Sequence, residues 1–374
     1  MFIDWLTVSQ EYDHDLPVVC DVFTVTIDSH TGEHLTTRQP RFKHQGSFSS
    51  LIMISVQGRK VRVEGNPSRI NRLDNLFGYQ TVGECLPVYN AILAEYGLPA
   101  LTRGTRLEHR QSADGKRAHQ WSDGCCIERI DLTTNVGVGE GNVLAYLRSL
   151  STQRIANSIG YLWPNGRTVD WRSTKGGVRH QYRKMYDKAY EIADKLLPRV
   201  KRLSGSDSAE YFYVSKIHDY CTKHGVVRQE QELKSEFLSL KGLRFYGLFD
   251  ESRFQTIHDE FLTTDEKLQV TAMDLKTISQ TLQDKDICAN AYAANTTAMY
   301  AFNWMNGQIF DFTKSSVKTH RARLRKIGID IANQCDHSRF TPVIVSQARE
   351  VTKTYQLPMP DWYRQPRAHL RAVA

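Results

Sequence analysis

Residues 166–191, GRTVDWRSTKGGVRHQYRKMYDKAYE, carry the clearest structural signal in the sequence. The pattern predicts a β-hairpin with 168–171 as one strand, 173–177 as the turn and 178–190 as the return strand. Because alternate residues of a strand share a face, the return strand would present one row of polar side chains: Tyr182, Lys184, Tyr186, Lys188 and Tyr190. Such a face is too polar for a core and too regular for a loop.

The phenol and ammonium groups of this row suggest a chemistry. A tyrosine hydroxyl activated beside a lysine ammonium is equipped to attack a phosphodiester, because the phenolate is the stronger nucleophile. The same row would also suit an exposed strand that binds DNA phosphates without any chemistry. The hairpin alone leaves both interpretations open.

Two further segments combine strand patterns with charged residues. In residues 127–134, IERIDLTT, Asp131 shares a face with Arg129, and in residues 225–234, GVVRQEQELK, Arg228 shares a face with Glu230 and Glu232. Carboxylates on neighbouring strands are hard oxygen ligands suited to Mg²⁺ or Mn²⁺. The alternative is a set of arginine–carboxylate ion pairs on the solvated face of a sheet, which would contribute little energy.

The composition narrows the classes of protein. The chain has 374 residues, 40% of them hydrophobic and 24% charged, which suits a globular protein with room for two domains. Its net charge of +8 favours an anionic partner. The seven cysteines are scattered without a CxxC pair, so neither a zinc knuckle nor a disulfide framework is indicated. With no signal-peptide pattern and no bilayer-length apolar stretch, we expect a cytoplasmic protein without membrane partners.

Strands and helices alternate irregularly along the first two thirds of the chain. The patterns predict strands at 3–9, 18–26, 50–56, 60–64, 126–134 and 226–233, and helices at 67–75, 82–96, 142–150 and 211–223. Hairpin links rather than regular βαβ units favour an α+β domain on an antiparallel sheet. The strand signal fades after residue 250, so we predict an N-terminal domain at 1–250 and a mainly helical domain at 251–374.

Residues 304–331, WMNGQIFDFTKSSVKTHRARLRKIGIDI, resemble a helix-turn-helix followed by a wing. Ser315 or Ser316 could cap a helix that runs to Ile327, with Val317, Leu324 and Ile327 facing inward. We expect the outward face to be basic and suited to a DNA groove, through Lys318, Arg321 and Arg325. A solvated basic helix without a partner would have the same pattern.

Six separated blocks together resemble the replication initiation proteins of filamentous bacteriophages, the gene II protein family. In order, they are IDWLTVS (3–9), VEGNPSRINRLDNLFG (63–78), IERIDLTT, MYDK (185–188), GVVRQEQELK and MPDWYRQP (359–366). The chain looks most similar to the RstA type of vibrio CTX-like phages, and TVDW…STKGG…YDK is also similar to staphylococcal rolling-circle plasmid initiators. One detail departs, because Leu73-Asp74-Asn75 stands where the family has Gly-His-Asn.

The resemblance implies roles for individual residues. Tyr186 matches the nucleophile and Lys188 its companion. Asp131 and Glu230 match the acidic metal-site positions, with Glu232 and Asp4 as further acidic candidates for holding Mg²⁺ or Mn²⁺. Related initiators use a His-hydrophobic-His strand motif that this sequence lacks, so carboxylates would have to replace it. The basic residues beside these positions would contact DNA: Lys184, Arg129 and Arg228.

The function implied is a rolling-circle initiator with an antiparallel-sheet nuclease domain and a winged-helix-like C-terminal region. It would nick the phage plus-strand origin in supercoiled or single-stranded DNA, leaving a 5′-phosphotyrosine and a 3′-OH primer, and later rejoin the displaced strand. A host helicase and the host replicative polymerase would be its partners in the bacterial cytoplasm. The alternatives are a non-enzymatic DNA-binding regulator and, less favoured because the Arg…HxxR box is absent, a tyrosine recombinase.

Overall fold

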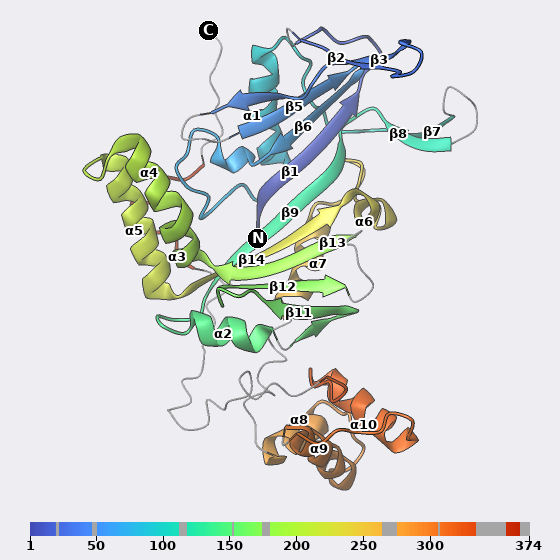
Figure 1. The fold of residues 1–374 in the computed structure, drawn as a ribbon, viewed down its shortest axis with the longest axis vertical. Coiled ribbons are helices and arrows are strands. Elements are labelled where there is room, and N and C mark those ends of the chain that lie inside the picture. The colour runs from blue at the N-terminus through green and yellow to red at the C-terminus, as the bar shows by residue number, and fades with distance from the viewer. Residues whose placement is uncertain are drawn as a thin grey trace.

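A ten-stranded antiparallel sheet forms the framework of the protein and runs through the middle of Figure 1. The predicted α+β fold is therefore confirmed. The computed structural model describes residues 1–19, 22–46, 51–111, 118–151, 153–173, 180–263, 275–305, 307–333 and 357–366. From edge to edge, the strands are β10 (Arg154–Ile155), β11 (Ser158–Leu162), β12 (Thr168–Ser173), β13 (Gln181–Asp187), β14 (Val226–Lys234), β9 (Cys126–Gly137), β1 (Phe2–Glu11), β6 (Lys60–Gly65), β5 (Leu51–Gln57) and β4 (Phe42–Gln45).

The middle of the sheet brings together strands that are far apart in the sequence. β14 pairs with β13 on one side and with β9 on the other, both antiparallel. In this register Tyr186 lies opposite Arg228, and Lys184 lies opposite Glu230. Because directly opposed residues of paired strands share a face, the hairpin row and the charged residues of β14 lie on the same face of the sheet.

The predicted return strand of the hairpin is too long. β13 ends at Asp187, whose side chain accepts a hydrogen bond from the backbone N–H of Tyr190 (3.0 Å) and begins the short helix α3 (Lys188–Glu191). Lys188 and Tyr190 therefore do not belong to the strand row, and the row consists of Tyr182, Lys184 and Tyr186. Most of the predicted turn lies outside the described residues.

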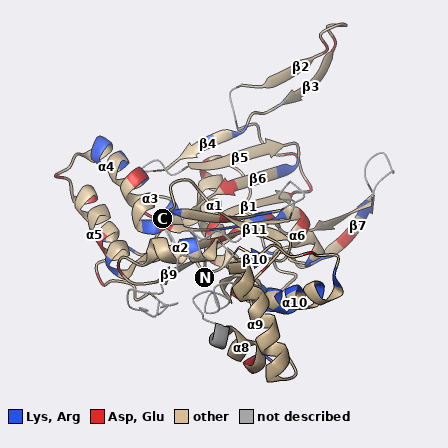
Figure 2. Cartoon of the chain, turned by 60° about the horizontal axis from the view of Figure 1, so that its bottom comes forward, with Lys and Arg blue, Asp and Glu red and all other residues tan. Residues whose placement is uncertain are grey.

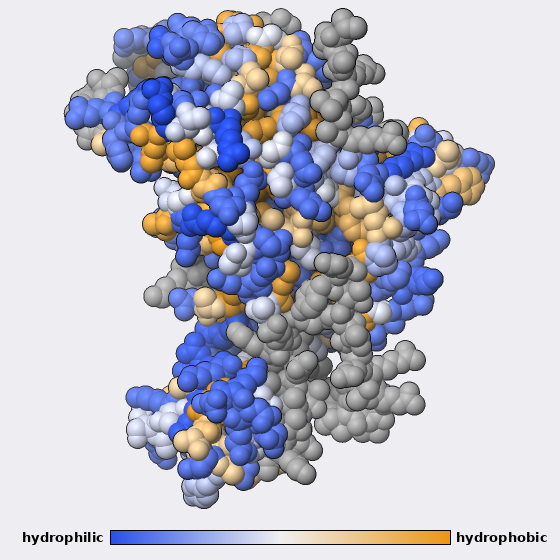
Figure 3. All heavy atoms as spheres, turned by 180° about the vertical axis from the view of Figure 1, so that it is seen from behind, coloured by the Kyte–Doolittle hydropathy of each residue, from blue (hydrophilic) through white to orange (hydrophobic). Residues whose placement is uncertain are grey.

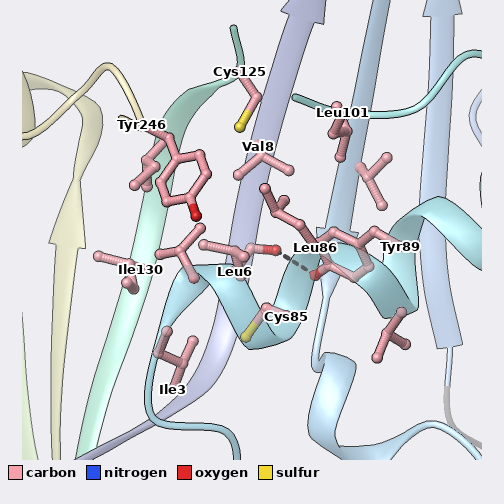
Figure 4. Close-up of a cluster of buried hydrophobic side chains, with 14 of the residues drawn as sticks. Ile3, Leu6, Val8, Cys85, Leu86, Tyr89, Leu101, Cys125, Ile130 and Tyr246 are labelled. Carbon is pink, nitrogen blue, oxygen red and sulfur yellow. Dashed lines mark hydrogen bonds between the residues drawn. The ribbon is translucent and has the colours of Figure 1, made fainter. Parts of the chain in front are cut away.

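The opposite face of the sheet carries the main hydrophobic core. Helix α1 (Val82–Glu95), which is closed at its start by a capping box between Thr81 and Glu84, packs its apolar side against β1, β6 and β9. Figure 4 shows Tyr89 among these side chains, with its hydroxyl donating to the carbonyl of Leu6 (2.8 Å). The predicted helix at 82–96 is confirmed, with Leu86, Tyr89 and Leu93 buried on its apolar side.

Three more helices cover the same apolar face: α2 (Val143–Leu150), α6 (Ser235–Leu240) and α7 (Ser252–Leu262). Phe261 of α7 is buried against Trp171 of β12, with ring centroids 5.7 Å apart in an edge-on arrangement. The first helix after the expected domain boundary at residue 250 thus completes the core of the N-terminal sheet.

A second layer lies beside the sheet where β13 ends. It contains the π-helical turn η3 (Ile192–Leu196), α4 (Leu197–Ser204) and α5 (Ala209–His224), seen with α3 to the left of the sheet in Figure 1. Gly225 ends α5 in the left-handed region (φ 57°), where an added Cβ would strike the backbone of Gly139. The predicted helix at 67–75 is wrong, because only the 3-10 turn η2 (Pro67–Arg69) forms there.

Two hairpins extend from the sheet. β2 (Thr24–Ile27) pairs with β3 (His34–Arg38), and Figure 2 shows this pair projecting away from the body. β7 (Leu107–Gln111) pairs with β8 (Ala118–Ser122), where the Arg110 guanidinium lies 3.3 Å from the ring centroid of Trp121. Both hairpins lie outside the hydrophobic clusters of the sheet.

The C-terminal part is mainly helical, as expected. It contains α8 (Leu275–Asp284), α9 (Ala291–Met305) and α10 (Ser315–Lys326), and Figure 3 shows it as the lower lobe, mostly hydrophilic on that face. Val317, Leu324 and Ile327 point inward as predicted, but Lys314 rather than a serine precedes the helix, without a side-chain cap. No strand occurs among the residues described after 250, so the wing stays a prediction.

No helix within the described part of the chain is long and apolar enough to cross a membrane.

The contact between α7 and β12 leads to a prediction about stability. Phe261→Ala should lower the free energy of unfolding by about 3–5 kcal/mol, because it opens a cavity beside Trp171. Phe212→Ala on α5, where the ring is 57% exposed, is the matched control and should cost no more than about 0.5 kcal/mol. Urea denaturation of both variants measures the difference. Equal, small effects would mean that α7 does not belong to the core of the sheet.

Candidate active site

The polar face of β13, β14 and β9 is organised around the hydroxyl group of Tyr186. That hydroxyl donates a hydrogen bond of 2.6 Å to Oε1 of Glu230, and the Lys184 ammonium lies 2.6 Å from Oε2 of the same carboxylate. Lys184 also lies 5.5 Å from the centroid of the Tyr186 ring. One carboxylate therefore holds both a phenol that could act as a nucleophile and a cation beside it.

Burial and charge act in opposite directions on this group of side chains. Burial raises the pKa of Tyr186 well above its usual value, and the negative charge of Glu230 adds to the shift, whereas the nearby Arg228 lowers it. Burial also raises the pKa of Glu230, but the positive charges of Lys184 and Arg228 outweigh it and the net pKa lies below the usual value. The resting state is thus a neutral phenol that donates to a carboxylate.

Arg228 is completely buried beneath the loop formed by residues 66–78. Its Nε donates to Oδ1 of Asn135 (3.0 Å), and its Nη2 donates to the backbone carbonyls of Asn75 and Leu76. Its Nη1 lies 3.8 Å from Oδ2 of Asp4. The prediction of Arg228 as a DNA contact is at odds with this burial, which gives the guanidinium an internal structural and electrostatic role.

Lys188 reaches the same region from α3 rather than from the strand. Its ammonium lies 2.8 Å from the carboxylate of Glu191 and donates to Oδ1 of Asn75 (3.1 Å), with the side chain almost fully buried. The side-chain nitrogen of Asn75 in turn donates to Oδ1 of Asp4 (2.8 Å). Lys188 and Asp4 are therefore linked through Asn75, at the edge of the Tyr186 environment.

Asn75 was not predicted as a site residue. The only sequence signal for it was its position in the block that departs from the family pattern, at the end of Leu73-Asp74-Asn75. Asn66, also missed, donates to the same oxygen of Asp4 (2.8 Å). Short polar residues in a loop have many structural uses, so their contribution becomes visible only once the loop is seen to fold over the sheet.

A second charged cluster lies on the same face, further along β9 and β14. The Arg129 guanidinium holds Asp131 through two hydrogen bonds (2.8 and 2.7 Å) and lies 3.0 Å from the carboxylate of Glu232. Lys234 lies 3.5 Å from Glu232. This is the arginine–carboxylate pairing that the sequence left open as the alternative to metal ligation, and Arg129 is engaged in it rather than free.

Asp131 has an unusual protonation equilibrium. Burial raises its pKa from 3.8 to about 7, and Glu232 and Glu230 add to the shift, although Arg129 opposes it. The carboxylate is thus incompletely compensated by its ion pair. A further cation at this position would be electrostatically favourable.

The predicted metal ligands are all engaged within the chain. Asp4, Asp131, Glu230 and Glu232 each hold hydrogen bonds or ion pairs, and no three His, Cys, Asp or Glu side chains in the described ranges form a group that could hold a metal ion. The donor set is nevertheless of the hard oxygen type that Mg²⁺ prefers. Binding would require Lys184 or Arg129 to yield part of its carboxylate contact.

The other tyrosines of the hairpin have separate environments. The Tyr182 hydroxyl donates to Oδ2 of Asp170 (2.7 Å), which also pairs with Arg172, and burial raises the Tyr182 pKa. Tyr190 is exposed on α3, where the Arg167 guanidinium lies 5.0 Å from its ring centroid. Neither residue shares the Glu230 carboxylate with Tyr186.

The basic residues predicted to contact DNA from α10 differ in whether they are already held in ion pairs. Arg321 forms hydrogen bonds with Asp330 (2.7 and 3.2 Å), which also pairs with Arg154 (2.8 Å). Arg325 lies 4.0 Å from the same carboxylate, and Lys318 is exposed. Figure 2 shows much of the α10 ribbon in blue, the colour of Lys and Arg. Asp330 thus fastens the basic helix near β10 and neutralises part of its charge.

Comparison with known proteins extends over both parts of the chain. The family model for the N-terminal region of the phage replication-associated protein, the gene II protein, matches residues 1–252, and the model for its C-terminal region matches residues 282–369. The replication-associated gene II protein of Escherichia phage If1 is 46% identical over 323 residues, which cover 86% of this chain and 100% of the phage protein. No solved structure matches the chain.

The raised pKa of Asp131 predicts a pH dependence of stability. Because the folded protein binds this proton more tightly than the unfolded chain, Asp131 should destabilise the fold progressively as the pH rises from about 4 to about 7. Asp131→Asn should therefore gain melting temperature relative to the wild type over that interval, as measured by thermal unfolding at each pH. A melting-temperature difference that stays constant from pH 4 to 8 would contradict the shift.

Proposed function

The chain belongs to the family of phage replication-associated gene II proteins, and on this premise we propose that it initiates rolling-circle replication by nicking the phage plus-strand origin through Tyr186. Membership of the RstA type is part of the same proposal. The observation that carries the chemistry is the Tyr186 hydroxyl donating to Glu230 beside the Lys184 ammonium. This arrangement gives the phenol a proton acceptor and places a cation beside it.

Glu230 is suited to accept the phenolic proton when a phosphate arrives. The 2.6 Å hydrogen bond already directs this proton at Oε1, so transfer requires no rearrangement of the acceptor. The raised pKa of Tyr186 opposes ionisation in the resting state. A cation that arrives with the DNA must therefore lower the Tyr186 pKa, because the negative phosphate alone would raise it further. Phenolate formation would then be limited to the DNA-bound enzyme.

Each step of the proposed reaction exchanges one phosphodiester bond for another. The Tyr186 oxygen bonds to phosphorus, the bond from phosphorus to the 3′-oxygen of the preceding nucleotide breaks, and that oxygen takes up a proton to become a free 3′-OH. The 5′ end remains joined to the tyrosine. Attack by a later 3′-OH on this phosphotyrosine reverses the chemistry, rejoins the strand and returns the phenol without ATP.

Lys184 and Arg228 would stabilise the charge that develops during attack. Lys184 is about one-third exposed, so its ammonium can contact a phosphate oxygen while it stays close to Glu230. Arg228 acts from below through its fixed position and charge. Lys188, the companion residue expected from the family, would act through Asn75 rather than by touching the Tyr186 oxygen.

Asp131, Glu230, Glu232 and Asp4 are the residues proposed to hold Mg²⁺ or Mn²⁺. The raised pKa of Asp131 supports this, because a bound divalent cation would favour its ionised form. When bound, the ion would polarise the scissile phosphate and neutralise charge on its oxygens. Arg129, which already pairs with Glu232, would keep that contact beside the ion.

Origin DNA is the proposed partner, as supercoiled duplex and as single strand. We assign duplex affinity to the C-terminal region through Lys318, Arg321 and Arg325, and the single strand to the polar sheet face with Lys184 and Arg129. A host helicase would open the duplex and the host replicative polymerase would extend the 3′-OH in the bacterial cytoplasm. The expected two-part division of labour remains part of this proposal, with α7 and residues 357–366 packed on the N-terminal part.

Replacing the nucleophile tests the proposal most simply. Tyr186→Phe keeps the ring but removes the attacking oxygen, so nicking of supercoiled origin plasmid should fall by about three orders of magnitude or more, with no covalent adduct and retained DNA binding. Tyr190→Phe is the matched control and should cut normally, since that ring is exposed on α3. Adduct formation by Tyr186→Phe would transfer the role to Tyr182 or Tyr190. Specific binding by a wild type that never cuts would favour a DNA-binding regulator.

Metal ligation predicts a changed magnesium requirement. Asp131→Asn should raise the Mg²⁺ concentration for half-maximal nicking by roughly tenfold or more, because a neutral amide oxygen holds a hard cation weakly. Glu128→Gln on the same strand is the control, since Glu128 pairs instead with Arg62 and Lys60. Wild-type nicking that persists in excess chelator would overturn the metal proposal and leave Asp131 with its Arg129 pairing.

A further inference from the structure

The segment 357–366, near the C-terminal end of the chain, returns to the N-terminal sheet. Within it Leu357 and Tyr363 are buried in a cluster with Leu73 and Leu76 of the loop 66–78. The Tyr363 ring packs edge-on against Phe77, with centroids 5.1 Å apart. The segment is therefore part of the hydrophobic packing of that loop, although about 280 residues separate them in the sequence.

The hydroxyl of Tyr363 joins three groups of the loop. It donates to Oδ1 of Asp74 (2.6 Å) and accepts from the backbone N–H of Phe77 (2.9 Å) and from Nη2 of Arg72 (2.7 Å). Asp74 is itself buried and also accepts from the Leu76 N–H (2.9 Å). Without the Tyr363 hydroxyl, the buried Asp74 carboxylate and the partly buried Phe77 N–H, on either side of residues 75 and 76, would each lose a hydrogen-bond partner.

Residues 75 and 76 are the part of this loop that reaches the candidate active site. The Asn75 side chain bridges Asp4 and Lys188, and the Asn75 backbone carbonyl accepts from the buried Arg228. The Leu76 carbonyl accepts from Arg228 (3.1 Å) and from Nδ2 of Asn135 (2.6 Å). The Tyr363 hydroxyl thus fixes the residues immediately before and after the pair that contacts the polar face.

Further contacts fasten the segment to α5. The Tyr220 hydroxyl donates to the carbonyl of Pro358 (2.7 Å), and the Arg364 N–H donates to the Tyr213 hydroxyl (3.2 Å). The Arg364 guanidinium also lies 4.4 Å from the Tyr213 ring centroid. Both ends of the segment are held, so Tyr363 is a fixed point against which the loop is positioned.

We propose that residues 357–366 are a built-in positioning element of the nicking site, in which the Tyr363 hydroxyl sets the place of Asn75 and hence of Lys188, Asp4 and Arg228. The inference rests on the proposed function of Tyr186. Tyr363 is a positioning residue, because it touches none of the reacting groups. Its loss should slow the chemical step and leave DNA affinity unchanged, since small displacements near a reacting group cost rate.

The test compares Tyr363→Phe with Tyr12→Phe in the full-length protein. Tyr12 donates its hydroxyl to the carbonyls of Pro99 and Ala100 (both 3.2 Å), outside the loop, so this variant removes a comparable hydroxyl elsewhere. Covalent adduct formation is followed under single-turnover conditions with a single-stranded origin oligonucleotide. For Tyr363→Phe we expect a rate constant reduced by about 10- to 100-fold, with the amplitude and the oligonucleotide Kd within about twofold of wild type.

A purely structural role would give a different result. If Tyr363→Phe only unfolded part of the protein, the amplitude would fall while the rate constant stayed normal, and the inference would be wrong. A wild-type rate in Tyr363→Phe would also overturn it. Asp74→Asn, which keeps the side-chain shape but removes the charge that accepts from Tyr363, should lower the rate constant in the same direction even if Tyr363→Phe folds poorly. Wild-type protein without any adduct would instead overturn the proposed function, and this inference with it.

Discussion

The buried guanidinium of Arg228 is the interaction on which the rest of the active-site region depends. A charge removed from water must be paired and hydrogen-bonded. Its Nε and Nη2 are hydrogen-bonded to Asn135 of β9 and to two backbone carbonyls of the loop 66–78, whereas Nη1 has no hydrogen bond among the described residues and lies 3.8 Å from the carboxylate of Asp4. To satisfy one side chain in the middle of the sheet, the loop has to fold over the sheet's polar face, and it brings Asn75 with it.

The same charge shapes the chemistry proposed for its neighbours. Arg228 lowers the pKa of Tyr186 against the effects of burial and of Glu230, and it acts with Lys184 to keep Glu230 ionised. The paired strands β13 and β14 therefore bring together the protonated phenol of Tyr186, the ionised carboxylate of Glu230 and two cations, Lys184 and Arg228. Asp131 lies in the neighbouring charged cluster with Arg129 and Glu232. Burial raises its pKa, and a bound divalent cation would stabilise its ionised carboxylate.

Strand periodicity made the central part of this site predictable. Alternation along β13 predicts that Tyr186 and Lys184 share a face, and alternation along β14 predicts the same of Arg228 and Glu230. The pairing register of the two strands places all four residues on one face of the sheet. The prediction failed where local signals compete: the Asp187 cap ends the strand before Lys188, although α3 still carries that lysine into the site. The contacts of Tyr363 with the loop 66–78 could not be predicted from the sequence. Single polar contacts between distant segments produce no repeating pattern of residues.

Direct mapping of the covalent product tests the central claim, that Tyr186 is the attacking group. The protein would be incubated with a single-stranded origin oligonucleotide and Mg²⁺, digested with protease and nuclease, and the nucleotide-bearing peptide sequenced by mass spectrometry. The account predicts one modified peptide containing residues 185–188, with the nucleotide joined to Tyr186 through its 5′-phosphate. A nucleotide on Tyr182 or Tyr190, or one joined through a 3′-phosphate, would contradict it.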